Sequence, residues 1–245
     1  MIRNWRASAA RAMRRPSAPV THTLIVLCCV VFLAGPASGL NPVYGTGDEL
    51  LAAQRAWFRR WGVIPADLFE GSPGAALTPA TALFVHGSWV HLLGNMLFLH
   101  VFGAMTEARM GRVQFTLFYV GCGYLALLGY AAANADAEQS LVGASGAISA
   151  VLGAFLFLFP RARVTSLLPF LFFLPVRFPA WVVLPFWAAL QWAAARQQAA
   201  DGPGVAYLAH LLGFGLGFVF AWVRFGRTTR VKAAPAPAPE GENQP

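Results

Sequence analysis

Gly143-Ala144-Ser145-Gly146 opens an apolar stretch that contains no charged residue before Arg161. A hydroxyl group inside such a stretch is unfavourable, because hydrocarbon offers no water to satisfy it. The chain uses alanine freely where only a small side chain is needed, so we interpret Ser145 as a functional residue. The first question about its role is which group removes the proton of this serine.

Apolar residues make up 57% of the 245 residues and charged residues 11%, whereas a typical soluble domain is about 25% charged. The charges are separated by charge-free runs close to or above the roughly 18 residues that cross a bilayer. We therefore predict an all-α, polytopic membrane protein with six transmembrane helices, one in each of the runs 16–47, 71–106, 113–135, 139–160, 178–195 and 202–223. The run 164–176 holds 13 residues and two prolines, so we expect an interfacial segment or a loop there.

A net charge of +8 invites comparison with nucleic-acid-binding proteins, but its distribution indicates a membrane topology. If the N-terminus is internal and the chain crosses six times, fourteen of the 18 Lys and Arg residues fall in cytoplasmic segments. The four external ones are Arg55, Arg59, Arg60 and Arg196. This is the positive-inside bias, so we expect both termini in the cytoplasm, the lipid bilayer as a partner and no nucleic-acid partner.

Three parts of the chain differ in composition. Residues 1–19 are basic and are predicted to form a cytoplasmic tail, residues 20–226 hold the six spans, and residues 227–245 are Ala/Pro-rich and expected to be disordered. Within the middle part, residues 41–79 form a long external segment whose mixed Trp, Phe and Arg residues suit a helix at the headgroup level. The compactness of the chain favours the inner membrane of a bacterium.

Two polar residues of the second predicted span lie on one face of the helix. His91 and Asn95 are four residues apart and therefore stack on each other. Paired hydrogen-bonding groups in a transmembrane helix usually face a polar cavity. His86 points elsewhere, and we interpret it as a cap for the start of this helix.

Small residues recur at four-residue spacing in the fourth and sixth spans, as Ser145, Ser149 and Gly153 and as Gly213 and Gly217. Small residues at this spacing let transmembrane helices approach closely. Helix packing alone is the plain interpretation. A more specific interpretation, which also requires this packing, is that the contact between the two helices brings Ser145 close to His210.

Ser145 and His210 are residue types that can act together as a nucleophile and its general base. Serine is a weak nucleophile until a base takes its proton, and imidazole titrates near neutral pH. Attack on an amide carbonyl creates an oxyanion, for which His91, Asn95 and the backbone N–H of Ser145 are candidate donors. No intramembrane carboxylate is placed to orient the histidine, so a Ser-His dyad is the economical hypothesis.

Other kinds of hydrolytic site fit less well. The chain has no His-Glu-x-x-His sequence and no pair of intramembrane aspartates. The serine elbow of soluble hydrolases ends in glycine, whereas this chain has Ala147. A zinc site formed by His86, His91 and His210 is conceivable, but no cysteine or carboxylate clearly joins them. We therefore expect no metal.

The chain resembles the rhomboid family of intramembrane serine proteases through three motifs in the expected order, His86-x4-His91-x3-Asn95, Gly143-x-Ser145-Gly146 and Ala209-His210-x2-Gly213-x3-Gly217. The resemblance covers roughly residues 20–225 and implies a six-span rhomboid-like helical bundle. It also implies hydrolysis of peptide bonds in transmembrane protein substrates, within or near the bilayer and without a cofactor. The roles it implies are nucleophile for Ser145, general base for His210, oxyanion support for His91, Asn95, Gly143 and Gly146, and an accessory role for His86.

Two positions depart from patterns seen in the family. Ser149 stands where some members have an aromatic residue that stacks on the histidine. The external segment reads Trp57-Phe58-Arg59 in place of a Trp-Arg pair. Neither change removes a reacting group.

Two other classes of function fit the sequence less well than a protease. A catalytically silent relative that only binds transmembrane segments typically lacks the serine or the histidine, and this chain has both. A transporter would show an inverted repeat or helices broken at the midplane by Gly and Pro, and the chain has no convincing internal repeat. An active intramembrane serine protease is therefore the favoured hypothesis, with its natural substrate and oligomeric state open.

Overall fold

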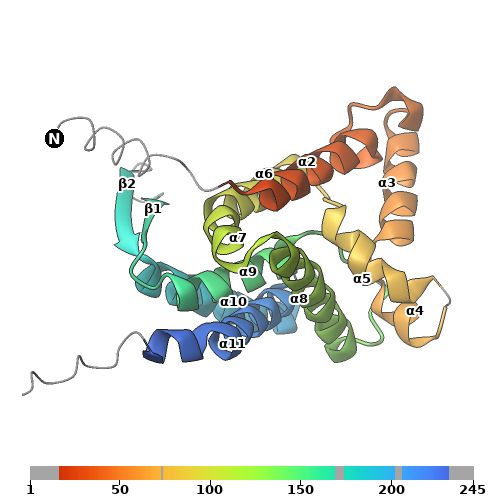
Figure 1. Ribbon diagram of the computed structural model, residues 1–245. Coiled ribbons are helices and arrows are strands. Elements are labelled where there is room, and N and C mark those ends of the chain that lie inside the picture. Colours follow the sequence, from red (N-terminus) through yellow and green to blue (C-terminus); the bar gives the residue numbers. More distant parts are fainter. Residues whose placement is uncertain (1–16, 73, 169–173, 202–205, 232–245) are drawn as a thin grey trace, which may run out of the picture.

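The computed structural model describes residues 17–72, 74–168, 174–201 and 206–231, and these are mainly helical (Figure 1). Short 3-10 turns and a π-helical segment, Leu99–Gly103, connect the helices, and the latter joins α6 to α7. The helices are α2 (Pro19–Ala34), α3 (Asp48–Trp61), α4 (Pro65–Phe69), α5 (Thr78–Thr81), α6 (Trp89–Phe98), α7 (Ala104–Met110), α8 (Arg112–Ala133), α9 (Ser145–Leu158), α10 (Ala180–Asp201) and α11 (Tyr207–Val231). The predicted tails lie almost wholly outside the described residues.

Three of the described helices are long and apolar enough to cross a membrane, namely Trp89–Met110, Arg112–Ala133 and Tyr207–Gly226. Two shorter apolar helices, α2 with 16 residues and α9 with 14, lie in the first and fourth predicted spans. The helical membrane class is confirmed, whereas the number of six spans stays a prediction.

A small β-sheet lies outside the all-α prediction. Strand β1 (Arg163–Leu168) pairs antiparallel with β2 (Leu174–Pro179), in a register from Arg163 opposite Pro179 to Leu168 opposite Leu174. The prediction of a loop for 164–176 was therefore wrong for the described residues, whereas the alternative of an interfacial segment stays a prediction. Proline destabilises the interior of a helix. It is tolerated in a two-stranded sheet, because each strand has one edge whose backbone N–H groups make no bonds to a neighbouring strand.

The predicted external segment is folded and helical where its Trp, Phe and Arg residues suggested a helix. It contains α3 and α4, which stand at one side of the helical bundle (Figure 1). Val63, in the middle of this segment, exchanges backbone hydrogen bonds of 2.9 and 2.7 Å with Leu141. These bonds join the segment to the chain just before Ser145. The external segment therefore helps to place the start of α9.

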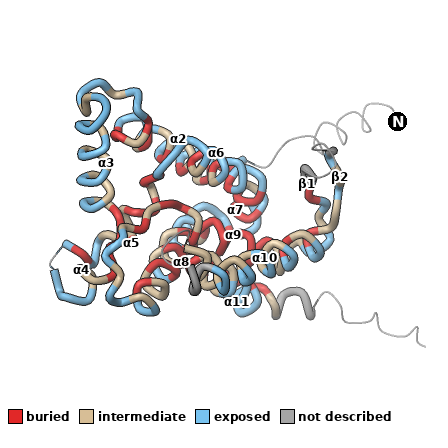
Figure 2. Tube along the Cα trace, turned by 180° about the vertical axis from the view of Figure 1, so that it is seen from behind, coloured by how far each residue is buried: buried red, intermediate tan, exposed pale blue. Residues whose placement is uncertain are grey.

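Helix α9 is the centre of the fold, with all ten residues from Gly146 to Phe155 buried (Figure 2). It packs against α8, α10 and α11. Most of its buried residues are Gly, Ala or Ser, which leave room for neighbouring helices to approach its backbone closely. Packing of this kind is the main stabilising interaction between helices in lipid, where burial of apolar surface gives no extra driving force.

Contact between α9 and α11 is made by their backbones. A Cβ atom added to Gly213 would overlap the carbonyl oxygen of Gly146, and one added to Gly217 would overlap that of Ala150. A Cβ atom on Gly153 would in turn overlap the carbonyl oxygen of Phe214. The matched positions increase together along both helices, so α9 and α11 run in the same direction.

Glu107 of α7 caps the N-terminus of α2 from a distant part of the chain. Its carboxylate is buried and accepts hydrogen bonds from the backbone N–H of Val20 at 3.0 Å and of Thr21 at 2.7 Å. The hydroxyl of Thr21 donates to the same carboxylate at 2.8 Å. The negative charge lies at the positive end of the helix dipole, which strengthens these bonds.

Replacing Gly217 with alanine is expected to lower the free energy of unfolding by about 2 kcal/mol, because the new methyl group forces α9 and α11 apart. Gly215→Ala is the matched control, since the space around Gly215 is open and alanine favours a helix. Unfolding in detergent should separate the two variants. Equal stability of both variants would contradict backbone contact at Gly217.

Replacing Glu107 with alanine is expected to remove about 2 kcal/mol of stability, because three donors at the start of α2 lose their acceptor. A melting temperature about 5 °C below that of the wild type is the expected readout. Glu70→Ala changes an exposed carboxylate and should leave the melting temperature unchanged. If both variants melt together, the capping interaction does not stabilise the fold.

Candidate active site

The hydroxyl oxygen of Ser145 lies 2.8 Å from Nε2 of His210. Ser145 is the first residue of α9, and His210 lies in the first turn of α11. Because these helices run in the same direction, both side chains lie at the same end of the pair. The backbone contact between Gly146 and Gly213 follows immediately along both chains, and it holds the two side chains within hydrogen-bonding distance.

The other ring nitrogen of His210 is hydrogen-bonded to α10. Nδ1 lies 2.7 Å from the side-chain oxygen of Gln191. In this orientation of the Gln191 amide, its oxygen accepts from Nδ1, so Nδ1 carries the proton and Nε2 presents its lone pair. The hydroxyl of Ser145 then donates to Nε2, which is the arrangement that a general base needs.

Aromatic rings surround His210, although none comes from position 149. The ring of Trp187 on α10 lies 6.3 Å from the imidazole and is inclined by 31° to it. The ring of Tyr207 lies 6.2 Å away and meets it edge-on, at 87°. Ser149 instead donates its hydroxyl hydrogen to the backbone oxygen of Ser145 at 2.6 Å.

A cavity of about 240 Å³ opens beside the Ser-His pair. Its polar lining residues come from four helices and are His91, Asn95, Ser145, Ser149, Gln191 and His210. The structure therefore gathers around one cavity four of the residues to which the sequence analysis gave roles, namely His91, Asn95, Ser145 and His210. Apolar side chains, including Phe98 and Trp187, complete the lining.

His91 and Asn95 approach the chain just before the serine. A Cβ atom on Gly143 would lie 2.7 Å from Nε2 of His91 and 3.7 Å from Nδ2 of Asn95. Gly143 also has a φ angle of +125°, which L side chains rarely adopt. Among the described residues, Nδ2 of Asn95 is buried without a hydrogen-bond partner, so this amide is a free donor beside the serine.

A model of the rhomboid domain family matches residues 74–227, which is more than half of the chain and includes Ser145 and His210. The chain belongs to the rhomboid family. Rhomboids are intramembrane serine proteases that act on membrane proteins, and this chain is an integral membrane protein.

Similar rhomboid proteins come from distant organisms. The chain is 37% identical over 161 residues to Rhomboid protein 1, mitochondrial, of Saccharomyces cerevisiae, covering 62% of this chain and 44% of the relative. It is 34% identical over 79 residues to the rhomboid protein YdcA of Bacillus subtilis, covering 32% and 39%. It is 30% identical over 109 residues to RHOMBOID-like protein 5 of Arabidopsis thaliana, covering 44% and 35%. The chain thus spans less than half the length of each of these relatives.

His86 does not line the rhomboid cavity and does not cap α6. Ser88 is the cap, because its side-chain oxygen accepts from the backbone N–H of His91 at 3.2 Å. His86 is buried, with Nδ1 3.4 Å from the carbonyl oxygen of Phe84. Its ring meets the ring of His91 edge-on at 5.1 Å, so His86 supports His91 from the side away from the cavity.

The remaining glycines of the motifs lie in the helix contact rather than in the cavity. Gly146 presents its carbonyl oxygen to Gly213, and Gly153 lies two turns further along α9. In the described ranges, no group of three His, Cys, Asp or Glu side chains is arranged to hold a metal ion. The three histidines considered as a zinc site therefore do not form one there.

Gln191 is the residue of this site that the sequence analysis missed. It is the only residue with an amide or hydroxyl side chain in the charge-free run 178–195. An isolated polar side chain in an apolar transmembrane run is unfavourable unless it has a partner. That argument, applied to Ser145, also singles out Gln191, but no spacing relates it to His210.

Replacing Gln191 with leucine is expected to slow labelling of Ser145 by a fluorophosphonate about tenfold or more, because the imidazole loses the acceptor that orients it. The ¹⁵N spectrum of His210 should change from one dominant tautomer to a mixture. Gln197→Leu, at an exposed position of α10, should alter neither measurement. An unchanged labelling rate and tautomer in Gln191→Leu would show that the amide does not position His210.

Proposed function

We propose that this rhomboid is an active intramembrane serine endopeptidase whose nucleophile is Ser145 and whose general base is His210. The hydrogen bond of 2.8 Å between them, inside a cavity between membrane helices, is the observation that carries the proposal. Substrates are proposed to be transmembrane proteins, in keeping with the family. Gln191 is proposed as a positioning residue that keeps Nε2 directed at the serine.

The proposed reaction begins when Ser145 attacks the carbonyl carbon of the scissile peptide bond. The hydroxyl proton moves to Nε2 of His210 as the oxygen–carbon bond forms. The imidazolium keeps its Nδ1–H bond to Gln191, and then gives the Nε2 proton to the leaving amine as the carbon–nitrogen bond breaks. A water molecule, activated by the same imidazole, hydrolyses the acyl-enzyme and returns the serine to its starting state.

Donors for the oxyanion are proposed to come from three places. Nδ1 of His91 accepts from the backbone N–H of Gly87 at 3.4 Å, so the neutral ring carries its proton on Nε2, the atom beside Gly143. Asn95 offers the buried amide donor that lacks a partner among the described residues. The backbone N–H of Ser145 lies in the first turn of α9, where helical N–H groups have no helical acceptor. Each such donor typically contributes a factor of about 10²–10³ to kcat.

The size of the cavity limits the form in which a substrate can react. An α-helix with its side chains is about 10–12 Å across, whereas the cavity holds only about 240 Å³. We propose that the substrate unwinds around the scissile bond and enters as an extended segment. Transmembrane segments with residues that weaken a helix near the cleavage site are therefore the favoured class of substrate.

We propose that the chemistry takes place below the external membrane surface, and the length of α9 supports this depth. Its 14 residues span about 21 Å, whereas the hydrocarbon core is about 30 Å thick. With its C-terminal end at the cytoplasmic interface, near Arg161, Ser145 lies roughly 9 Å inside the opposite boundary. We propose a bacterial inner membrane as the location, with both termini in the cytoplasm. The relative from yeast is mitochondrial by name.

Replacing Ser145 with alanine is expected to reduce cleavage of a reporter transmembrane substrate in proteoliposomes at least about 10³-fold, because Ser145 is the only hydroxyl within hydrogen-bonding distance of His210 among the described residues. Ser149→Ala removes a hydroxyl one turn further along the same helix and should retain most activity. Folding of both variants is checked by their melting temperatures. Equal cleavage by the wild type and Ser145→Ala would contradict the proposal, and a wild type that binds the reporter without cleaving it would favour a silent relative.

A further inference from the structure

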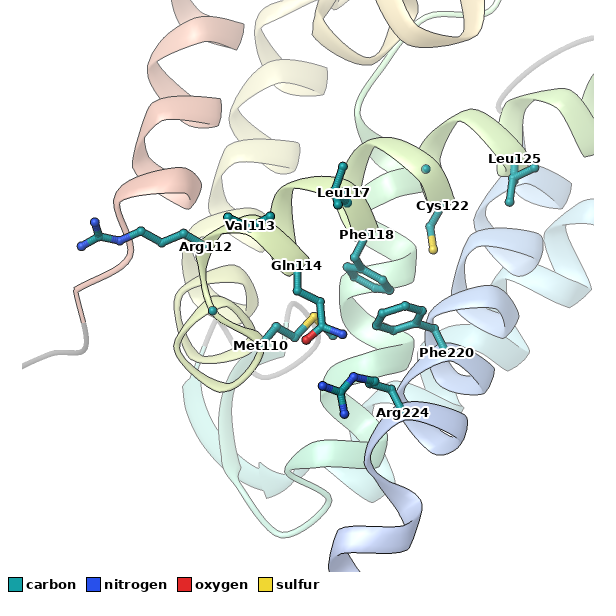
Figure 3. A pocket seen from close by; sticks show the side chains of 12 residues that line it. Met110, Arg112, Val113, Gln114, Leu117, Phe118, Cys122, Leu125, Phe220 and Arg224 are labelled. Carbon is teal, nitrogen blue, oxygen red and sulfur yellow. The ribbon is translucent and has the colours of Figure 1, made fainter.

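A second groove lies between α8 and α11, on a part of the molecule that shares no residue with the Ser145 cavity (Figure 3). Its volume is about 840 Å³. One end is formed by the first turn of α8, and the groove continues along that helix as far as Leu125. Residues 112 to 125 of a helix extend about 20 Å, about two thirds of the roughly 30 Å thickness of the hydrocarbon core.

Most of the groove is apolar. The rings of Phe118 and Phe220 form its floor, with centroids 4.8 Å apart. Leu117 and Leu125 are 70% and 50% exposed at its rim. At Gly121 an added Cβ atom would meet nothing within 4 Å, so the groove is open at mid-length. These features fit a flexible hydrocarbon chain.

The end near the start of α8 is polar and positively charged. Arg224 of α11 lies beside Gln114 there, whereas the side chain of Arg112 points away (Figure 3). In the amide orientation that satisfies both groups, Gln114 donates to the carbonyl oxygen of Met110 at 3.2 Å and accepts from Nε of Arg224 at 3.2 Å. This bond and the ring of Phe225, whose centroid lies 5.3 Å from the guanidinium carbon, hold the guanidinium of the exposed Arg224 at this end of the groove.

No carboxylate neutralises this charge in the part of the chain that the structure describes. The only ion pair there joins Arg59 to Asp67, in a different region, and no acidic residue lines the groove. The adjacent N-terminus of α8 has no side-chain cap, which adds to the positive potential. An exposed arginine held in one orientation binds phosphate well through its planar pair of N–H groups.

We propose that this groove binds an anionic phospholipid of the cytoplasmic leaflet. The headgroup phosphate lies on Arg224, and one acyl chain follows α8 over Phe118 and Phe220. Charge distribution supports this occupant, because Arg224 belongs to the arginine-rich side predicted to be cytoplasmic, where anionic lipids are enriched. A second copy of the chain, docking an apolar helix, would leave the guanidinium unpaired.

The bound lipid joins the two helices that flank α9. α11 carries Arg224 at one end and His210 at the other, and α8 packs against α9 through Gly123, whose added Cβ would lie 2.7 Å from that of Ala147. A ligand that binds only the folded protein stabilises it by an amount that rises with the logarithm of its concentration above Kd. Anionic lipid is therefore expected to raise the melting temperature of the whole bundle.

Native mass spectrometry of the full chain, in detergent supplemented with equal amounts of phosphatidylglycerol and phosphatidylcholine, tests the proposal. The wild type is expected to retain phosphatidylglycerol in preference, and Arg224→Gln should reduce that preference about fivefold. Gly121→Leu fills the open middle of the groove and should reduce retention of both lipids. Arg161→Gln, which removes an exposed charge outside the groove, should leave the preference unchanged.

Two results would overturn the proposal. One is equal retention of the two lipids by the wild type, or a preference that Arg224→Gln and Gly121→Leu leave intact. The other is a dimer that Gly121→Leu disrupts while lipid retention stays the same, which would make a second copy the occupant. Melting temperatures of the variants without added lipid exclude misfolding as the cause of lost retention.

Discussion

Direct contact between the backbones of α9 and α11 is the constraint on which the site depends. Gly213 and Gly217 leave no side chain between the helices, so their carbon atoms rest on the carbonyl oxygens of Gly146 and Ala150. In lipid, such close packing takes the place of the hydrophobic effect as the force that joins helices. The consequence is that Ser145, one residue before the contact, and His210, three residues before it, face each other.

Polar side chains inside the bundle divide into those with partners and those without. Glu107 is satisfied by three donors at the start of α2, and Gln191 is satisfied by His210. Asn95 instead keeps a buried donor without a partner among the described residues. A buried donor of this kind costs stability unless something accepts its hydrogen, so its position beside Ser145 marks where negative charge is expected to develop during a reaction.

The sequence predicted those features that depend on a regular residue spacing or on a strong compositional bias. The apolar runs predicted the helical membrane class, and the four-residue spacing of His91 and Asn95 placed both on the face that lines the cavity. It missed the strand pairing within the run 164–176, because a short run with two prolines argues against a spanning helix without showing which strands pair. It also missed Gln191, since an isolated amide has no spacing that identifies its partner on another helix. The family comparison then gave the class of protein, but not the role of any single residue.

An experimental structure of the full chain in a lipid nanodisc is the most direct measurement of the central claim. The account predicts that the axes of α9 and α11 approach within about 8 Å near Gly213. It also predicts that the hydroxyl oxygen of Ser145 lies near 2.8 Å from Nε2 of His210. Helices held about 10 Å apart, with the hydroxyl and the imidazole facing different sides, would contradict it.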